Sequence, residues 1–257
     1  MKRKTDIFIF LAFLLVGGML LISSNEKKPF IVVIDAGHGG KDPGALGSSS
    51  YEKDIALAVA LGFGKILKDS LKDVKVIFTR QEDVFVELHK RAQIANDARA
   101  DLFISIHCNS STAKHAHGSE TYVMGLHANE RNMGVAQREN EVISKEDNSD
   151  AYEGFNLDSP ETKIILENFQ NAYLLNSANL ASKIQYEFKN YVKRHDRGIH
   201  QAGFIVLWKT NLPSVLVELG FISNYDEEKF LKGKKGQKEI AIAMYKALKD
   251  YKEELDY

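Results

Sequence analysis

The chain contains the stretch Ile31-Val32-Val33-Ile34-Asp35-Ala36-Gly37-His38-Gly39-Gly40, from which its predicted fold can be worked out. Its four consecutive aliphatic residues predict a strand that is covered on both faces, as the strands of parallel sheets are. The glycines that follow allow the backbone to turn sharply. His38 therefore lies just past the carboxyl end of the strand, where open α/β sheets place their ligands.

Apolar runs alternate with amphipathic stretches along the rest of the chain. We predict strands at 30–35, 74–79, 102–107, 121–124, 204–207 and 215–219, and helices at 52–71, 86–98, 164–191 and 240–251. This alternation implies an α/β fold with a mostly parallel, twisted sheet flanked by helices on both faces. The polar stretch from about 125 to 161 has little strand signal. We interpret it as one helical insertion in a single domain that spans 29–254.

Composition excludes some classes of protein. The chain has 257 residues and a formal net charge of −1, which gives no reason to expect a nucleic acid as partner. Its single cysteine, Cys108, excludes an internal disulfide. Hydrophobic and charged fractions are ordinary for a globular domain.

Residues 1–25 differ in character from the rest. A basic start, Lys2-Arg3-Lys4, precedes an apolar run from Ile7 to Ile22, and polar residues follow it. This pattern is typical of a secretory signal peptide, and the run falls short of the ~20 residues of a typical spanning helix. Because no small-residue cleavage site stands out, an N-terminal membrane anchor is the alternative. With either, we expect the remainder to be exported to the periplasm or cell envelope.

Three polar residues at the ends of predicted elements suggest a metal site. His38 follows the first strand, Glu52 opens the first helix, and His107 ends the strand at 102–107. Two histidines and one carboxylate form a known catalytic zinc set that leaves one coordination position open. Each residue alone has a plainer explanation, because strand-end histidines are often solvated and a helix dipole favours a carboxylate such as Glu52.

Glu218 ends the apolar strand at 215–219. A carboxylate there is costly unless it is paired with an arginine or belongs to a site. In a zinc site its natural role is that of general base, and then of general acid toward the leaving amine.

Other candidates are weaker. Successive side chains of a strand point to opposite faces, so Cys108 and His107 cannot both face one metal, and we expect Cys108 to be buried. The glycine loop lacks the spacing of a phosphate-binding loop, with Asp42 where a serine or threonine is needed. Of the remaining histidines, His200 could line the cleft, whereas we expect the others to be at the surface: His89, His115, His117, His127 and His195.

Four segments together carry a family pattern: Val33 to Ala45, Glu52-Lys53-Asp54, Ser105 to Asn109, and Val217 to Asn224. They resemble the zinc-dependent N-acetylmuramoyl-L-alanine amidases, in the branch with a single α/β domain that splits septal cell wall. A further set resembles the segment that links these motifs, namely Thr79, Arg80, Leu88, Arg91, Ala95 and Asn96. The likeness extends from Phe30 to Tyr251.

The resemblance implies a reaction and a set of roles. The enzyme would cleave the amide between N-acetylmuramic acid and L-alanine in peptidoglycan, with Zn²⁺ held by His38, Glu52 and His107 and with Glu218 as the catalytic carboxylate. Some members of the family carry an insertion that covers the zinc until an activator protein displaces it. The segment 125–161 lies at that place, and Glu139 or Glu141 could approach the metal. The alternatives are another zinc peptidase acting on the stem peptide, such as a carboxypeptidase, and a wall-binding protein without catalysis.

Overall fold

The computed structural model describes residues 28–125, 129–152 and 159–255. Within them lies a six-stranded sheet of order β2-β1-β3-β6-β4-β5. The strands are β1 (Phe30–Ala36), β2 (Val74–Phe78), β3 (Leu102–Asn109), β4 (Ser119–Met124), β5 (Asp196–Ala202) and β6 (Ser214–Phe221). Strands β2, β1, β3 and β6 are parallel, β4 runs antiparallel to β6, and β5 is parallel to β4. The predicted mostly parallel sheet is confirmed.

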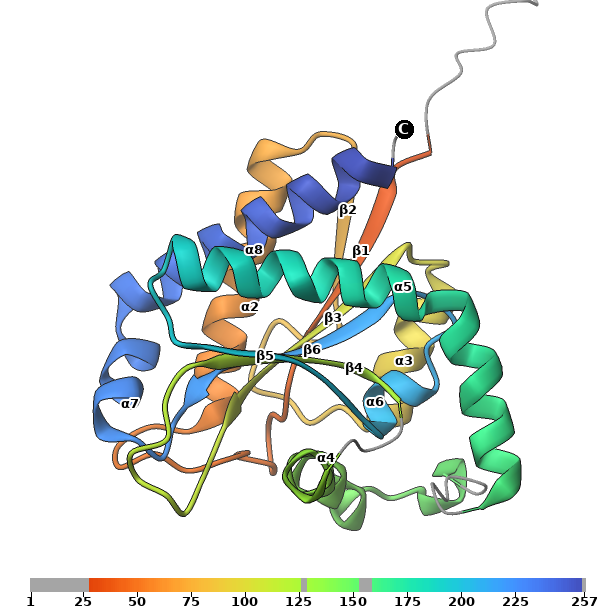
Figure 1. Ribbon diagram of the computed structural model, residues 1–257, viewed down its shortest axis with the longest axis horizontal. Coiled ribbons are helices and arrows are strands. Elements are labelled where there is room, and N and C mark those ends of the chain that lie inside the picture. The colour runs from red at the N-terminus through yellow and green to blue at the C-terminus, as the bar shows by residue number, and fades with distance from the viewer. Residues whose placement is uncertain (1–27, 126–128, 153–158, 256–257) are drawn as a thin grey trace, which may run out of the picture.

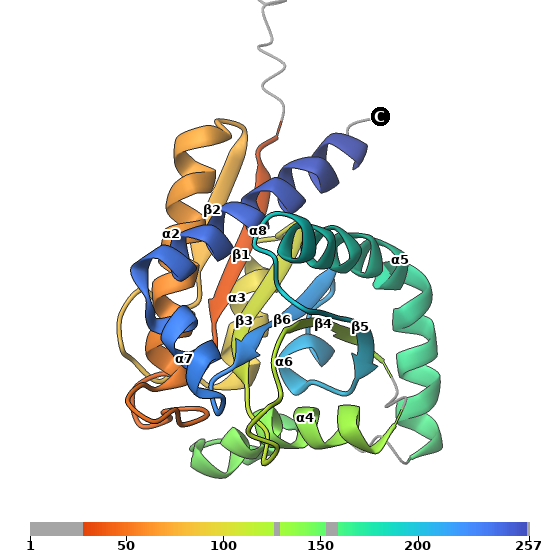
Figure 2. The same cartoon turned by 60° about the vertical axis from the view of Figure 1, so that its left-hand side comes forward.

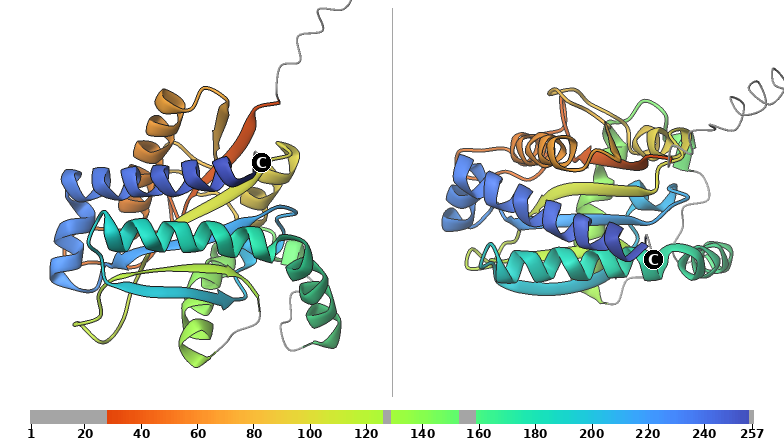
Figure 3. Two further views of the ribbon diagram at one scale, coloured as in Figure 1. Left: turned by 45° about the horizontal axis from the view of Figure 1, so that its top comes forward. Right: turned by 90° about the horizontal axis from the view of Figure 1, so that it is seen from above.

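Helices cover both faces of the sheet (Figures 1 and 2). One face packs against α2 (Glu52–Ser70), α5 (Pro160–Asn190) and α8 (Lys234–Leu255). The other face packs against α3 (Leu88–Asp97), α4 (Glu130–Asn140) and α6 (Ile205–Trp208). Figure 3 shows α5 and α8 side by side across the first face. The short helix α7 (Tyr225–Lys232) connects β6 to α8.

Strand β1 shows how the sequence produces these layers. Val32 and Ile34 belong to the core beneath α2 and α8, whereas Val33, between them, belongs to the core beneath α3. All three are fully buried. Burying each such side chain stabilises the fold by about 1.5–3 kcal/mol, which is why an unbroken aliphatic run becomes a central strand.

The strand predicted at 204–207 is wrong. Residues 205–207 form most of the short helix α6, which Phe204 precedes, whereas strand β5 ends earlier, at Ala202. A run of four apolar residues cannot by itself distinguish a strand from a buried helical turn. Strand β5 lies at the edge of the sheet and is polar and only partly buried, so it lacks the aliphatic run that identifies β1.

The stretch predicted as an insertion is helical where the structure describes it. It contains α4, the 3₁₀ helices η1 (Glu141–Lys145) and η2 (Ser149–Tyr152), and the first residues of α5. Residues 126–128 and 153–158 lie outside the described residues, as do residues 1–27, on which the prediction of a signal peptide or anchor falls. No helix in the described ranges is long and apolar enough to cross a membrane.

Candidate metal centre

The loop after β1 is held in an unusual backbone conformation. His38, Gly39 and Gly40 all have positive φ angles, of 58°, 123° and 56°. A left-handed conformation at a residue other than glycine costs about 1–3 kcal/mol, so the surrounding structure must hold His38 in place.

Two buried arginines hold this loop. Arg80 donates from Nε to the carbonyl of Ala36 (2.9 Å) and from Nη2 to that of Gly37 (2.7 Å). Arg91 donates to the carbonyls of Ala36 (2.7 Å) and His38 (2.8 Å). These four hydrogen bonds fix the direction in which the chain leaves β1, and therefore the position of the His38 ring.

Asp35 balances the charge of Arg91. Its carboxylate accepts from Arg91 Nη1 at 2.8 Å and from the hydroxyls of Thr79 and Ser105 at 2.6 Å each. Burial alone would raise the pKa of Asp35, but the Arg91 charge and the two hydroxyls outweigh it and lower that pKa below its usual value. The carboxylate therefore stays ionised in the interior as the counter-charge of the arginine that holds the loop.

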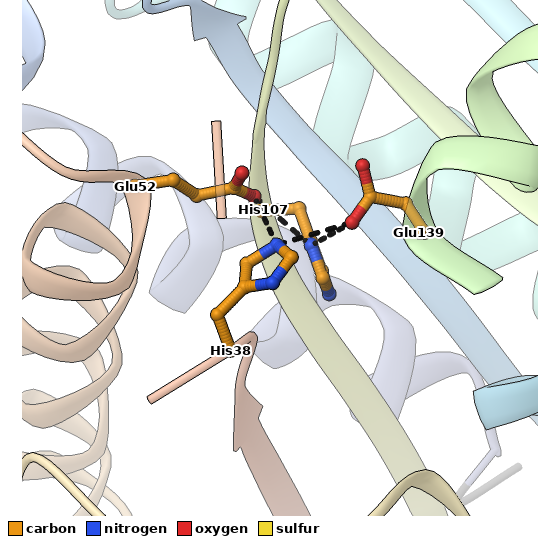
Figure 4. A group of neighbouring side chains, drawn as sticks. All are labelled: His38, Glu52, His107 and Glu139. Carbon is orange, nitrogen blue, oxygen red and sulfur yellow. Dashed lines mark hydrogen bonds and ion pairs between the residues drawn. The ribbon is translucent and has the colours of Figure 1, made fainter. Parts of the chain in front are cut away.

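Four side chains from four parts of the chain converge beside this loop (Figure 4). His38 Nε2 lies 3.1 Å from Glu52 Oε1 and 3.1 Å from Glu139 Oε2. His107 Nδ1 lies 3.0 Å from the same oxygen of Glu52 and 2.9 Å from that of Glu139. The structure thus brings together the three residues predicted as ligands and, of the two carboxylates offered from the insertion, Glu139 of α4. All four residues are buried.

Neighbouring groups orient these atoms. Asp42 Oδ2 lies 2.6 Å from His38 Nδ1, and a carboxylate at this distance favours a proton on Nδ1, so that Nε2 is available to bind a metal. Glu52 stands at the first turn of α2, and its Oε1 accepts from the backbone N–H of Cys108 at 2.8 Å while Oε2 accepts from that of Ala45 at 2.7 Å. Sequence reasoning missed the role of Asp42, although its spacing of four residues from His38 was visible.

The geometry of the four atoms fits a small metal ion. An ion with tetrahedral bonds of about 2.0 Å has ligand atoms about 3.3 Å apart, close to the four distances above. Although these contacts are short, His38 Nε2 and Glu139 Oε2 are buried and have no partner in hydrogen-bond geometry among the described residues. Burial would lower the pKa of His107, but the carboxylates of Glu139 and Glu52 outweigh it and raise that pKa to about 10. Positive charge is thus strongly favoured at the point where these atoms converge.

Glu218 lies on β6 directly beside His107 of β3 in the sheet register. It is fully buried, and neither of its carboxylate oxygens has a hydrogen-bond partner within the described part of the chain. Burial, followed by the nearby carboxylates of Glu139 and Glu52, raises the pKa of Glu218 well above its usual value. The plainer explanation, a pairing with an arginine, is wrong.

Most of the remaining candidate residues, Cys108 and the other histidines, lie where the sequence predicted. Cys108 is buried on the opposite face from His107. His115, His117 and His195 are exposed, while His127 lies outside the described residues. His89 is half-buried against Tyr152, so its predicted surface position is only partly correct. His200 contacts Arg131 on α4, with 2.8 Å between Nε2 and Nη2, and takes no part in the metal set. Glu141, offered beside Glu139, is exposed.

The site therefore has the donor set of a metal-dependent hydrolase: two imidazoles and two carboxylates could hold a metal ion beside the unpaired carboxylate of Glu218. The profile of the N-acetylmuramoyl-L-alanine amidase family matches residues 32–250. The chain belongs to this family.

Individual relatives agree with the family assignment. The N-acetylmuramoyl-L-alanine amidase AmiA of Escherichia coli K12 is 34% identical over 246 residues, which are 91% of this chain and 82% of that protein. AmiC of E. coli O6:H1 is 30% identical over 89% of this chain, which spans only 54% of AmiC. The crystal structure of the N-acetylmuramoyl-L-alanine amidase of Clostridium difficile 630 matches with a TM-score of 0.67 and 27% identity, covering 88% of this chain and 98% of that one.

Proposed function

We propose that this protein is a zinc enzyme that cleaves the amide bond between the lactyl group of N-acetylmuramic acid and L-alanine in peptidoglycan. In this proposal His38, Glu52 and His107 hold the zinc and Glu218 is the catalytic carboxylate. The convergence of the three ligand atoms beside Glu218 carries the proposal. Two histidine nitrogens with carboxylate oxygens and no thiolate are a donor set that suits zinc.

Different residues of the chain move the proton and orient the metal ligands in this reaction. Zinc bound here would polarise the amide carbonyl and acidify a water molecule. Glu218 accepts the proton of the attacking water and passes it to the amine of L-alanine as the C–N bond breaks. Asp42 and the backbone N–H of Cys108 keep His38 and Glu52 oriented throughout. The buried walls around Glu218 exclude bulk water from the proton that it carries.

Helix α4 closes this site in the described conformation. Glu139 lies where the fourth ligand of the metal would be, the position that a water or a substrate carbonyl requires. Arg131 and Arg138 of the same helix bind Glu120 and Asn109, and Lys145 of η1 binds Asp42 at 2.7 Å. In our proposal the insertion, about 125–161, inhibits the enzyme until an activator protein displaces α4.

The site of action follows from the substrate. We propose that residues 1–25 act as a signal peptide or membrane anchor and that the domain 29–254 works in the periplasm or cell envelope. Its role there is wall remodelling and the separation of daughter cells.

Digestion of purified peptidoglycan tests the proposal. The chain should release peptides with a free N-terminal L-alanine and glycan without peptide, as mass spectrometry can show. A chelator should abolish the reaction, zinc should restore it, and elemental analysis should find one zinc per active chain. Glu218→Gln should bind zinc normally and release nothing. Release of a terminal D-amino acid would instead indicate a carboxypeptidase, and binding without any product would indicate a wall-binding protein.

A further inference from the structure

Three buried polar side chains lie in one row across the sheet. His107 of β3 is in register with Glu218 of β6, and Glu218 is in register with Glu120 of β4. Side chains of register partners project from the same face, here the face that α4 covers. Neighbouring strands are about 4.8 Å apart, so the backbone of Glu120 lies roughly 10 Å from that of His107. Neither the metal nor the proton transfer uses Glu120.

Glu120 is fully buried, and each of its carboxylate oxygens accepts hydrogen bonds from a different group of residues. Its Oε1 accepts from Asn109 Nδ2 (2.5 Å) and from the hydroxyl of Tyr122 (3.0 Å), both on the sheet. Its Oε2 accepts from Arg131 Nη1 of α4 (2.8 Å) and, at 3.3 Å, from Arg197 Nε. His200 Nε2 also lies 3.6 Å from Oε2, so the shortest of the three contacts to this oxygen comes from the same helix that places Glu139 at the metal site.

Helix α4 also separates two cavities. One, of about 220 Å³, lies beside His38 and Asp42. The other, of about 500 Å³, is lined by Glu120, Asn109 and Arg197. Arg138 of α4 lines both and donates to Asn109 Oδ1 at 2.6 Å. Because α4 contributes residues to the walls of both cavities, its displacement would open them toward each other, with His38 lining one and Glu120 the other.

We propose that Glu120 is a substrate-positioning residue: in the open enzyme it binds an ammonium group of the stem peptide where Arg131 now lies. This inference rests on the proposed function. A buried carboxylate that loses a guanidinium is strongly destabilised unless another cation replaces it. Arg197 already donates to Oε2 at 3.3 Å while its guanidinium lies over the Phe221 ring, 4.8 Å from the centroid, so it does not supply the separate contact that Arg131 would vacate. Helix α4 therefore mimics the substrate at two points, with Glu139 at the metal and Arg131 at Glu120.

The length of the substrate agrees with this position. A distance of roughly 10 Å corresponds to about three extended residues. The amine-bearing diamino acid of a stem peptide comes two residues after the L-alanine whose amide bond is cleaved. A hydroxyl or acetamido N–H of the sugar would satisfy Glu120 less well, since neither carries the positive charge that Arg131 supplies.

The test compares Glu120→Gln with its parent in an Arg131→Ala background. That background removes the direct contact between Glu120 and α4, and the acetylated substrate then separates loss of an ammonium contact from changes at Asn109 or Arg197, which Glu120 also binds. With a soluble N-acetylmuramoyl tripeptide we expect Glu120→Gln to raise KM about tenfold while kcat changes less than twofold, as for loss of a charged hydrogen bond. Acetylating the substrate amine should raise KM by a similar factor for the Arg131→Ala enzyme and have little effect on the double variant.

A matched control and a binding measurement separate the outcomes. Glu130→Gln makes the same charge change at an exposed residue of the same cavity and should leave KM unchanged. An unchanged KM for Glu120→Gln would overturn the inference and leave the amidase intact. If Glu120→Gln raises KM but acetylation of the substrate amine does not, Glu120 does not bind an ammonium group, and a sugar group would be its partner instead. If calorimetry finds no binding of the muramoyl peptide to any variant, including one in which Glu139→Ala opens the site, the proposed function itself fails. Should Glu120→Gln unfold, the acetylated substrate still tests the inference in the Arg131→Ala enzyme.

Discussion

Asp42 Oδ2 lies 2.6 Å from His38 Nδ1, and this contact turns the opposite ring nitrogen toward Glu52 and Glu139. We predict that Asp42→Ala weakens zinc binding about 10–100-fold, because loss of a partner behind a metal-binding histidine has effects of that size. Titration with a zinc-competing chelator measures the change. Asp54→Asn, an exposed carboxylate on α2, should bind zinc like the native chain. Equal affinity in both variants would show that the tautomer of His38 does not depend on Asp42.

Arg91 supports the histidine loop from beneath, and its removal would leave Asp35 buried without its counter-charge. We expect Arg91→Ala to lower the free energy of unfolding by about 3–5 kcal/mol, the usual result of breaking a buried ion pair on one side. Chemical denaturation measures it. Gln93→Ala, an exposed position of the same helix, should change stability little. A small effect at Arg91 would mean that Arg80 alone holds the loop.

Glu228 stabilises the serine-containing loop, 48–50, that precedes Glu52. Its carboxylate accepts from the Ser48 hydroxyl, from the Ser49 N–H at 2.8 Å and from the Ser50 hydroxyl at 2.8 Å. Burial would raise the pKa of Glu228, but these hydrogen bonds outweigh it and lower that pKa from 4.5 to about 2. A carboxyl group whose pKa is lower in the folded state stabilises the fold above its unfolded pKa and loses this effect as the pH falls toward the folded value.

We therefore predict that Glu228→Gln melts at a lower temperature than the native chain at pH 7, and that the difference shrinks between about pH 4.5 and pH 2. Calorimetry of both proteins across this range measures the difference. Glu253→Gln, on the exposed end of α8, is the control and should show no such convergence. A difference that stays constant down to pH 2 would argue that the serine contacts do not depend on the charge.

The sequence alone predicted those parts of the structure that depend on the local pattern of apolar and polar residues. The aliphatic run at Ile31 to Ile34 identified the central strand, and polar residues at the ends of buried strands identified His107 and Glu218. The polar edge strand β5 could not be found, since its pairing with β4 stabilises it and no apolar pattern marks it. Glu139 could only be offered together with Glu141, because the choice depends on which face α4 turns toward the metal site.

Glu139 is the residue by which α4 reaches the metal site, so its substitution should open the enzyme. We predict that Glu139→Ala raises hydrolysis of purified peptidoglycan, without any activator, by about tenfold or more, because activity is limited by the fraction of molecules whose site is open. Dye release from labelled wall material measures the rate. The control is Glu141→Ala, which removes an exposed carboxylate at the end of α4 and should leave the rate at its basal level. If Glu139→Ala is no faster than this control, α4 does not limit access to the metal.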